Sequence, residues 1–187
     1  MRDPLQGRLV PMQVKTLLLD PAQNTPVLIL QESGAEDEPG SEDGIEDLAS
    51  AGEEGRRILP IWIGLFEASA IQMQLEGTEP PRPLTHDLMA DLLESLDVQL
   101  IAVVIHSLEE GTFYASLRLQ QGDELFDVDA RPSDAVALAL RADAELFVGE
   151  QVFAALTSRP EPETRRDEEL KRWFENLDPD DLGKYTM

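Results

Sequence analysis

Residues 124–141, with the sequence ELFDVDARPSDAVALALR, decide the fold of this chain. Residues 124–130 are bounded by turn residues and predict a strand. Ser133 is a favourable residue for a helix start, and the apolar residues of 134–141 recur at helical spacing. A strand that turns into a helix through Arg-Pro places both kinds of element in one folded body.

The same layout occurs earlier in the chain. Residues 61–71 (IWIGLFEASAI) align with residues 128–138 (VDARPSDAVAL): each is a strand end, a tight break, an acid-alanine pair and a small-residue helix. Each segment follows two further predicted strands. The chain therefore divides into two units of three strands and a helix. An internal duplication of a βββα unit would make Glu67 and Asp134 equivalent; the alternative is that carboxylates are simply favoured in first helical turns.

The remaining elements complete an α+β domain of antiparallel sheets with helices packed on them. A helix that begins near Thr85 bridges the two units, and we expect it to bury an apolar stripe. That stripe comprises Leu88, Met89, Leu92, Leu93 and Leu96. The expected strands are 12–19, 25–31, 58–63, 98–106, 112–119, 124–130 and 146–148, and the other expected helices are 67–75, 134–141 and 151–156.

Two segments differ in composition from this body. Residues 33–55 are almost all acidic or small, which predicts a mobile surface insertion; an acidic docking or cation-buffering loop is the alternative. Residues 158–187 are first polar and proline-bearing, then amphipathic around Leu170, Trp173, Phe174 and Leu177. We therefore expect one domain over residues 1–157 and a linker with an amphipathic tail over 158–187.

The overall charge restricts the classes of partner. The chain has 38 acidic and 15 basic side chains, a net charge of −23, so its surface repels nucleic acid and anionic membranes at long range. It has no cysteine, which excludes disulfides and thiolate metal sites. No apolar run is long enough for a membrane span or a signal peptide, and we expect a cytoplasmic protein.

Several stretches resemble the bifunctional nuclease (BFN) domain family, long catalogued as a domain of unknown function. The most specific are PRPLTHDLM at 81–89 and RPSDAVALALR at 131–141, in this order. The others are LLLDPAQNTPVLILQE, LPIWIGLFEASAIQMQLEG and GTFYASLRL, and the closing ENLDPDDLGKYTM is similar to the tail of bacterial members. The acidic insertion is the main departure from the family pattern.

The resemblance implies a compact α+β body that forms a homo-oligomer in at least some bacterial members. It also implies a nuclease that acts on both DNA and RNA. A non-catalytic oligomeric interaction or regulatory protein is the alternative, because the chain contains no familiar nuclease motif.

Phosphodiester hydrolysis needs an activated water and stabilisation of charge at phosphorus, commonly through carboxylate-bound Mg²⁺ or Mn²⁺. We expect Glu67, Asp87 and Asp134 to serve as catalytic groups with His86 as a general base or a metal ligand, and Arg82 and Arg131 to bind phosphate. The candidate metal ligands are Glu67, Asp87, Asp129 and Asp134.

Each of these residues also has a structural interpretation. Asp87, Asp134 and Glu67 stand at expected helix starts, where a carboxylate stabilises the helix without any catalytic role. His86 can be a hydrogen-bonding structural histidine. Arg131 can form an internal salt bridge with Asp134 or Asp129.

Overall fold

The computed structural model describes residues 7–21, 23–34 and 56–157. Most of the predicted acidic insertion and the whole C-terminal tail lie outside the described residues. The predictions made for them, and the domain boundary near residue 157, stay predictions.

The N-terminal half forms a three-stranded antiparallel unit followed by a helix. Strands β1 (Leu9–Asp20) and β2 (Thr25–Glu32) make a hairpin, and β3 (Ile58–Trp62) pairs with the other edge of β2. Asn24 adopts a positive φ of 51° in the hairpin turn, a conformation that asparagine tolerates better than most residues. Helix α2 (Leu65–Leu75) then begins after Gly64.

The second half repeats this order with additions. Helix α3 (Thr85–Ser95) precedes an antiparallel run of three strands, which a further helix, strand and helix follow. These elements are β4 (Gln99–Glu109), β5 (Thr112–Gln121), β6 (Glu124–Ala130), α4 (Pro132–Ala142), β7 (Glu145–Gly149) and α5 (Glu150–Thr157).

All seven strands belong to one sheet, in the order β3-β2-β1-β7-β4-β5-β6. Strand β7 stands at the centre, antiparallel to β1 and parallel to β4, and thereby joins the two three-stranded units. The predicted α+β fold is confirmed, with a single mixed sheet in place of separate antiparallel ones. The two units lie on either side of β7, but their origin by duplication stays a prediction.

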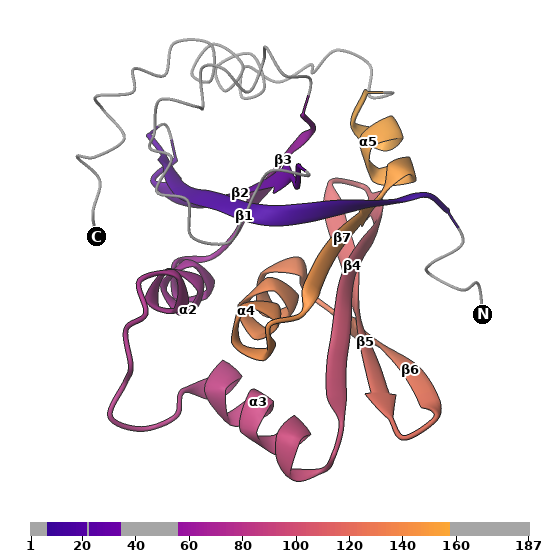
Figure 1. The fold of residues 1–187 in the computed structure, drawn as a ribbon. Helices are drawn as coiled ribbons and strands as arrows, with labels where there is room; N and C mark the ends of the chain where they lie inside the picture. The colour runs from indigo at the N-terminus through magenta and orange to yellow at the C-terminus, as the bar shows by residue number, and fades with distance from the viewer. Residues whose placement is uncertain (1–6, 22, 35–55, 158–187) are drawn as a thin grey trace.

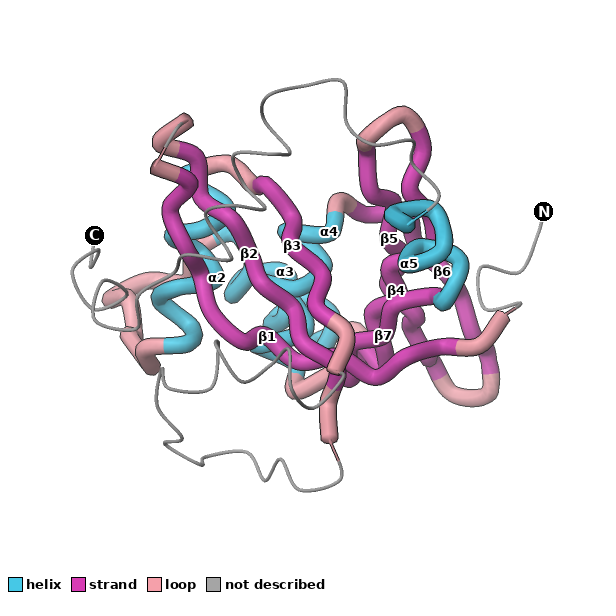
Figure 2. The backbone as a smooth tube through the Cα atoms, turned by 90° about the horizontal axis from the view of Figure 1, so that it is seen from above, coloured by secondary structure: helices cyan, strands magenta, loops and turns pink. Residues whose placement is uncertain are grey.

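Helices α2, α3 and α4 lie on one side of the sheet, and α5 lies beside β7 (Figure 1). Figure 2 shows the same layers from above. Helix α4 is central: its residues Ala135–Ala139 are at most 1% exposed, and their small side chains let α2 approach through Ala68, which is fully buried. None of the helices in the described ranges is long and apolar enough to cross a bilayer.

The prediction of a buried stripe on α3 is wrong for four of its five residues. Leu88, Met89, Leu92 and Leu96 are 52%, 37%, 51% and 61% exposed, and only Leu93 packs against the core. Helix α3 rests on α4 through its other side, where His86 is buried, so most of the leucines face outward. Helical spacing identifies an apolar face but not the neighbour that covers it.

The predicted caps also differ from the observed ones. Helix α4 begins at Pro132 with Arg131 as its cap, because the fixed φ of proline suits the first helical position; Ser133 lies inside the helix. Thr85, near which the sequence predicts a helix start, is the first residue of α3, and Leu84 precedes it.

Candidate functional site

The beginnings of α2 and α4 are joined by Arg131. Its Nη1 lies 2.9 Å from Oε1 of Glu67 on α2, and its Nε lies 2.6 Å from Oδ2 of Asp134 on α4. Gly64 leaves room for this arrangement: a Cβ added there would lie 2.2 Å from Oε2 of Glu67. The two acids of the repeated layout therefore share one guanidinium.

Helix α3 contributes His86 to the same group. Its Nε2 lies 3.2 Å from Oδ1 of Asp134, and the imidazole is buried where α3 meets α4. An ionised carboxylate only accepts hydrogen bonds, so this contact places the proton of a neutral imidazole on Nε2. We call Glu67, His86, Arg131 and Asp134 the helix-start cluster.

The cluster is open to solvent on the side of its arginine. The Arg131 side chain is 66% exposed, whereas those of Asp134, Glu67 and His86 are 31%, 21% and 10% exposed. No buried side-chain nitrogen or oxygen in the part of the chain that the structure describes lacks a partner. Since Nδ1 of His86 has no hydrogen-bond partner among these residues, solvent reaches it.

The charges of the cluster stabilise its ionised carboxylate. Burial alone would raise the pKa of Asp134, but the hydrogen bonds of Arg131 and His86 outweigh burial, and the pKa lies below its ordinary value. Asp134 is therefore a negative group near neutral pH, which suits the orientation of a histidine.

Asp87 belongs to a different and more enclosed network. Its Oδ1 accepts a hydrogen bond from Nε of Arg141, and its Oδ2 accepts one of 2.7 Å from the backbone N–H of Leu84. Arg141 is only 7% exposed and also donates to the carbonyls of Ala137 and Ala70, so it ties together α2, α3 and α4. The Arg141 hydrogen bond lowers the pKa of Asp87. This pair holds the helices in place.

The other two predicted residues lie apart from the cluster. Asp129 stands on β6 opposite Ser116, and Arg82 is exposed in the loop before α3. Neither forms a hydrogen bond or ion pair with the cluster within the described ranges.

No cation centre forms from the predicted ligands as they stand. Nowhere in residues 7–21, 23–34 and 56–157 do three histidine, aspartate or glutamate side chains gather so that one ion would fit between them. The carboxylates of Glu67, Asp87 and Asp134 instead each face an arginine.

A model of the bifunctional nuclease domain matches residues 50–160, which include all four residues of the cluster. The chain belongs to this family. Two uncharacterized proteins of Mycobacterium tuberculosis, one from strain H37Rv and one from strain CDC 1551, are each 38% identical to this BFN protein over 184 residues. Each match covers 91% of this chain and 96% of the relative.

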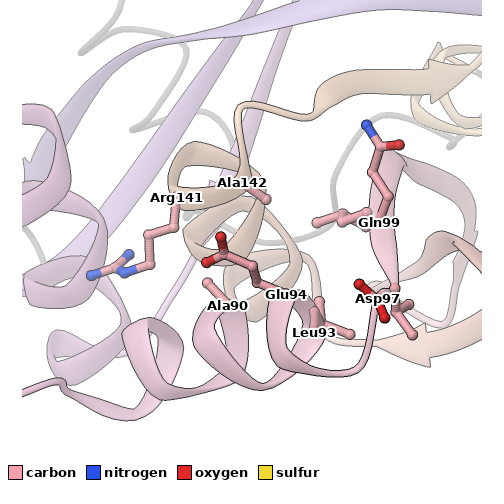
Figure 3. A pocket seen from close by; sticks show the side chains of 9 residues that line it. Ala90, Leu93, Glu94, Asp97, Gln99, Arg141 and Ala142 are labelled. Atoms are coloured by element: carbon pink, nitrogen blue, oxygen red, sulfur yellow. The ribbon is translucent and has the colours of Figure 1, made fainter.

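A pocket of about 440 Å³ lies between the C-terminal part of α3, the end of α4 and the start of β4 in this BFN domain. Ala90, Leu93, Glu94 and Asp97 line it from α3 and its end, and Gln99 lines it from β4 (Figure 3). The guanidinium of Arg141 points away from Gln99. None of the cluster residues contributes to the pocket, so it is no substrate cleft for the cluster.

Sequence patterns located the cluster but missed one of its neighbours. First-turn acids and the adjacent histidine pointed to Glu67, Asp87, Asp134 and His86, of which Asp87 lies outside the cluster. For Arg131 the structural alternative was a salt bridge with Asp134 or Asp129, and the structure has the one with Asp134. Arg141 was passed over as an ordinary helix-end residue. Its position seven residues after Asp134, and hence on nearly the same face of α4, was the available signal.

Proposed function

We propose that this BFN protein is a nuclease that hydrolyses phosphodiester bonds of DNA or RNA at the helix-start cluster. One observation carries the proposal: a histidine hydrogen-bonded to an ionised aspartate stands beside a solvent-exposed arginine, in a chain of the bifunctional nuclease domain family. Phosphodiester hydrolysis needs a group that transfers a proton and a cation that binds phosphate, and in this proposal the histidine and the arginine supply them.

Arg131 is the group that binds phosphate in this proposal. Its guanidinium already holds carboxylate oxygens of Glu67 and Asp134 with the fork geometry that also suits two phosphate oxygens. Because the side chain is mostly exposed, it can turn toward a substrate without opening the core. A bound phosphodiester would then take over part of the interaction with the Arg131 guanidinium that Glu67 and Asp134 now make.

His86 is the proton-transfer group. Asp134 holds Nε2, which leaves Nδ1 to accept a proton from the attacking water. The imidazolium formed in this way is stabilised by Asp134 and can return the proton to the leaving oxygen. Asp134 thus orients the histidine and is not itself the base.

Dependence on Mg²⁺ or Mn²⁺ stays part of the proposal. Glu67 and Asp134 would offer oxygen ligands only after Arg131 had left them, and an ion would then add charge stabilisation at phosphorus. Asp87 has no such freedom because Arg141 holds it inside the helix packing. The steps assigned to Arg131 and His86 do not require the ion.

The experiment compares two arginine-paired aspartates. Asp134→Asn removes the negative partner of His86, whereas Asp127→Asn neutralises the carboxylate paired with Arg118 on the outer strands. Hydrolysis of single- and double-stranded oligonucleotides is measured with Mg²⁺, with Mn²⁺ and with EDTA. We expect a loss of about 10²-fold or more for Asp134→Asn and wild-type rates for Asp127→Asn. Equal activity of the two variants would exclude this site.

The second candidate function is a non-catalytic interaction or regulatory module, probed by the same assay. The observation favouring it is that Arg131 is ion-paired with both carboxylates of the cluster. It predicts no turnover by purified wild-type protein under any metal condition. Homo-oligomer formation and cytoplasmic location stay predictions, which light scattering of the purified protein and fractionation of cells test.

A further inference from the structure

An apolar surface remains uncovered on the side of the sheet that carries the helices. Leu84, Leu88, Leu92 and Leu96 recur every four residues along the outer side of α3, and all are exposed. We call this row, together with Phe126 and Val128 of β6, the α3–β6 face.

Strand β6 belongs to this surface because of its register. Phe126 pairs with Leu119 and Val128 with Leu117, so both side chains share the face of the sheet on which those leucines join the core. The helices cover that face over the central strands but leave Phe126 and Val128 exposed. The end of α3 meets these strands where Gln121 donates to the carbonyl of Leu96.

The charged surroundings restrict what can cover this face. Neither α3 nor β6 contains a lysine or arginine. Exposed acids stand along them, including Asp91, Glu94 and Glu124. A second copy of the same face would bring acids against acids, whereas a segment with apolar residues and basic neighbours would be complementary.

Such a segment is present in the chain itself. Leu170, Trp173, Phe174 and Leu177 have the spacing of one helical face. Lys171 and Arg172 stand among them and Glu175 is the one acid of residues 170–177, so this stretch has a net charge of +1. Arg165 and Arg166 lie farther upstream and are followed directly by Asp167, Glu168 and Glu169. The match to the mycobacterial relatives leaves out fewer residues than segment 158–187 contains, so part of that segment is shared with them.

The connecting chain is long enough. Helix α5 is held to the end of β4 by the hydrogen bond from Gln151 to the carbonyl of His106. From His106 to Gln99, next to the end of α3, β4 extends about 23 Å, and α5 from Gln151 to Thr157 adds at most about 9 Å. Twelve residues separate Thr157 from Leu170, and this length of chain can extend about 40 Å.

We propose that residues 170–177 of the same chain bind to the α3–β6 face, with their apolar side chains on the leucine row and their basic residues beside Asp91 and Glu124. Burial of two apolar faces that would otherwise meet water drives this contact. The stripe of α3 is thus covered by the tail, and the helix-start cluster on the inner side of α3 remains open.

The test uses the absence of natural cysteines. Leu92→Cys and Leu177→Cys are introduced together into the full chain, and the rate of disulfide formation is followed by mass spectrometry of the oxidised monomer. The matched control combines Leu177→Cys with Leu125→Cys, which is also exposed but points to the opposite side of β6 from Phe126. We expect the Leu92 pair to cross-link at least about tenfold faster, because binding raises the effective concentration of the tail at α3.

Three results would overturn the proposal. Equal rates for the two pairs would mean that the tail does not prefer α3. A cross-linked dimer of the double variant would assign the tail to a neighbouring copy. Rapid disulfide-linked dimerisation of the Leu92→Cys single variant would mean that the α3–β6 face of a second copy, and not the tail, lies against this face.

Hydrogen exchange gives an independent measure without cross-linking. Trp173→Ala combined with Phe174→Ala should speed exchange of the α3 amides several-fold and leave β2 unchanged, while Tyr185→Ala should alter neither. Unchanged exchange in α3 would contradict the proposal.

Discussion

Arg131 is the residue through which the chemistry of the site is organised. It connects the first turn of α2 with that of α4, and Asp134 extends the connection to His86 on α3. The starts of α2 and α4 therefore share one guanidinium, and the start of α3 joins them through Asp134. The exposure of that guanidinium is what distinguishes the cluster from the enclosed pair of Asp87 and Arg141.

Replacing Arg131 should weaken substrate binding more than it weakens the fold. In Arg131→Ala the exposed ion pairs contribute little to stability, about 1 kcal/mol or less. The loss of charge-assisted hydrogen bonds to phosphate should raise KM for an oligonucleotide about tenfold or more. Steady-state kinetics measures the change, with Arg118→Ala as the matched control on the outer strands. An unchanged KM would remove Arg131 from the phosphate site.

Replacing Arg141 should weaken the fold more than it weakens substrate binding. Arg141→Ala removes the charged partner of the half-buried Asp87, which keeps only the backbone N–H of Leu84, and a side-chain donor to two helix carbonyls. This should cost about 2–4 kcal/mol of the free energy of unfolding. Urea denaturation measures this against Arg82→Ala, an exposed arginine in the loop before α3, for which we expect a change below about 0.5 kcal/mol. Similar midpoints for the two variants would contradict the structural role of Arg141.

At the scale of elements, the position of the cluster depends on how closely α2 approaches α4. Ala68 of α2 and three alanines of α4 (Ala135, Ala137 and Ala139) are at most 1% exposed, and the two helices pack against each other. Small residues at this contact bring Glu67 within reach of Arg131.

Ala68→Leu should therefore overfill the contact between α2 and α4. We expect a loss of about 1–3 kcal/mol in stability and a larger loss of activity than in Ser69→Leu, whose neighbouring site is exposed. Denaturation curves and hydrolysis rates, measured together, test both effects. Ala68→Leu with wild-type stability would show that the helices are not closely packed.

The elements themselves were largely predictable from the sequence, because each has a strong period and clear turn residues at its ends. The helix at residues 132–142 and the strands beside it follow the pattern within a few residues. The orientation of α3 could not be predicted from the sequence. Most of its leucines and its buried His86 lie on different sides of the helix, and their spacing does not show which side faces the core. First-turn acids were visible in the sequence, but the arginine that each one meets depends on tertiary packing.

The whole molecule combines a strongly acidic surface with a few carboxylates that the fold stabilises in ionised form. Arg57 lowers the pKa of Glu32, Arg141 that of Asp87 and Arg118 that of Asp127 through hydrogen bonds, and Arg131 and His86 overcome burial at Asp134. The net charge of −23 repels nucleic acid at long range, so substrate binding depends on local groups such as Arg131.

The lowered pKa values give stability a definite pH dependence. These carboxyls have lower pKa values in the folded than in the unfolded chain, so their contribution is complete above the unfolded values near 4 and is lost as the pH falls through the folded ones. Urea midpoints should therefore change little from pH 7 to 5 and fall below about pH 4. Asp87→Asn should reduce that acid-dependent fall, and a variant curve parallel to wild type would contradict the assignment.

The two histidines of the chain allow the most direct test of the central claim, that the helix-start cluster performs the reaction. His86→Ala removes the imidazole held by Asp134, and His106→Ala removes the other histidine, on β4 outside the cluster. Initial rates of oligonucleotide hydrolysis are compared for the two variants, prepared side by side and shown to be folded by circular dichroism. The account predicts a loss of about 10²-fold or more for His86→Ala and none for His106→Ala; equal rates in both variants and in the wild type would contradict it.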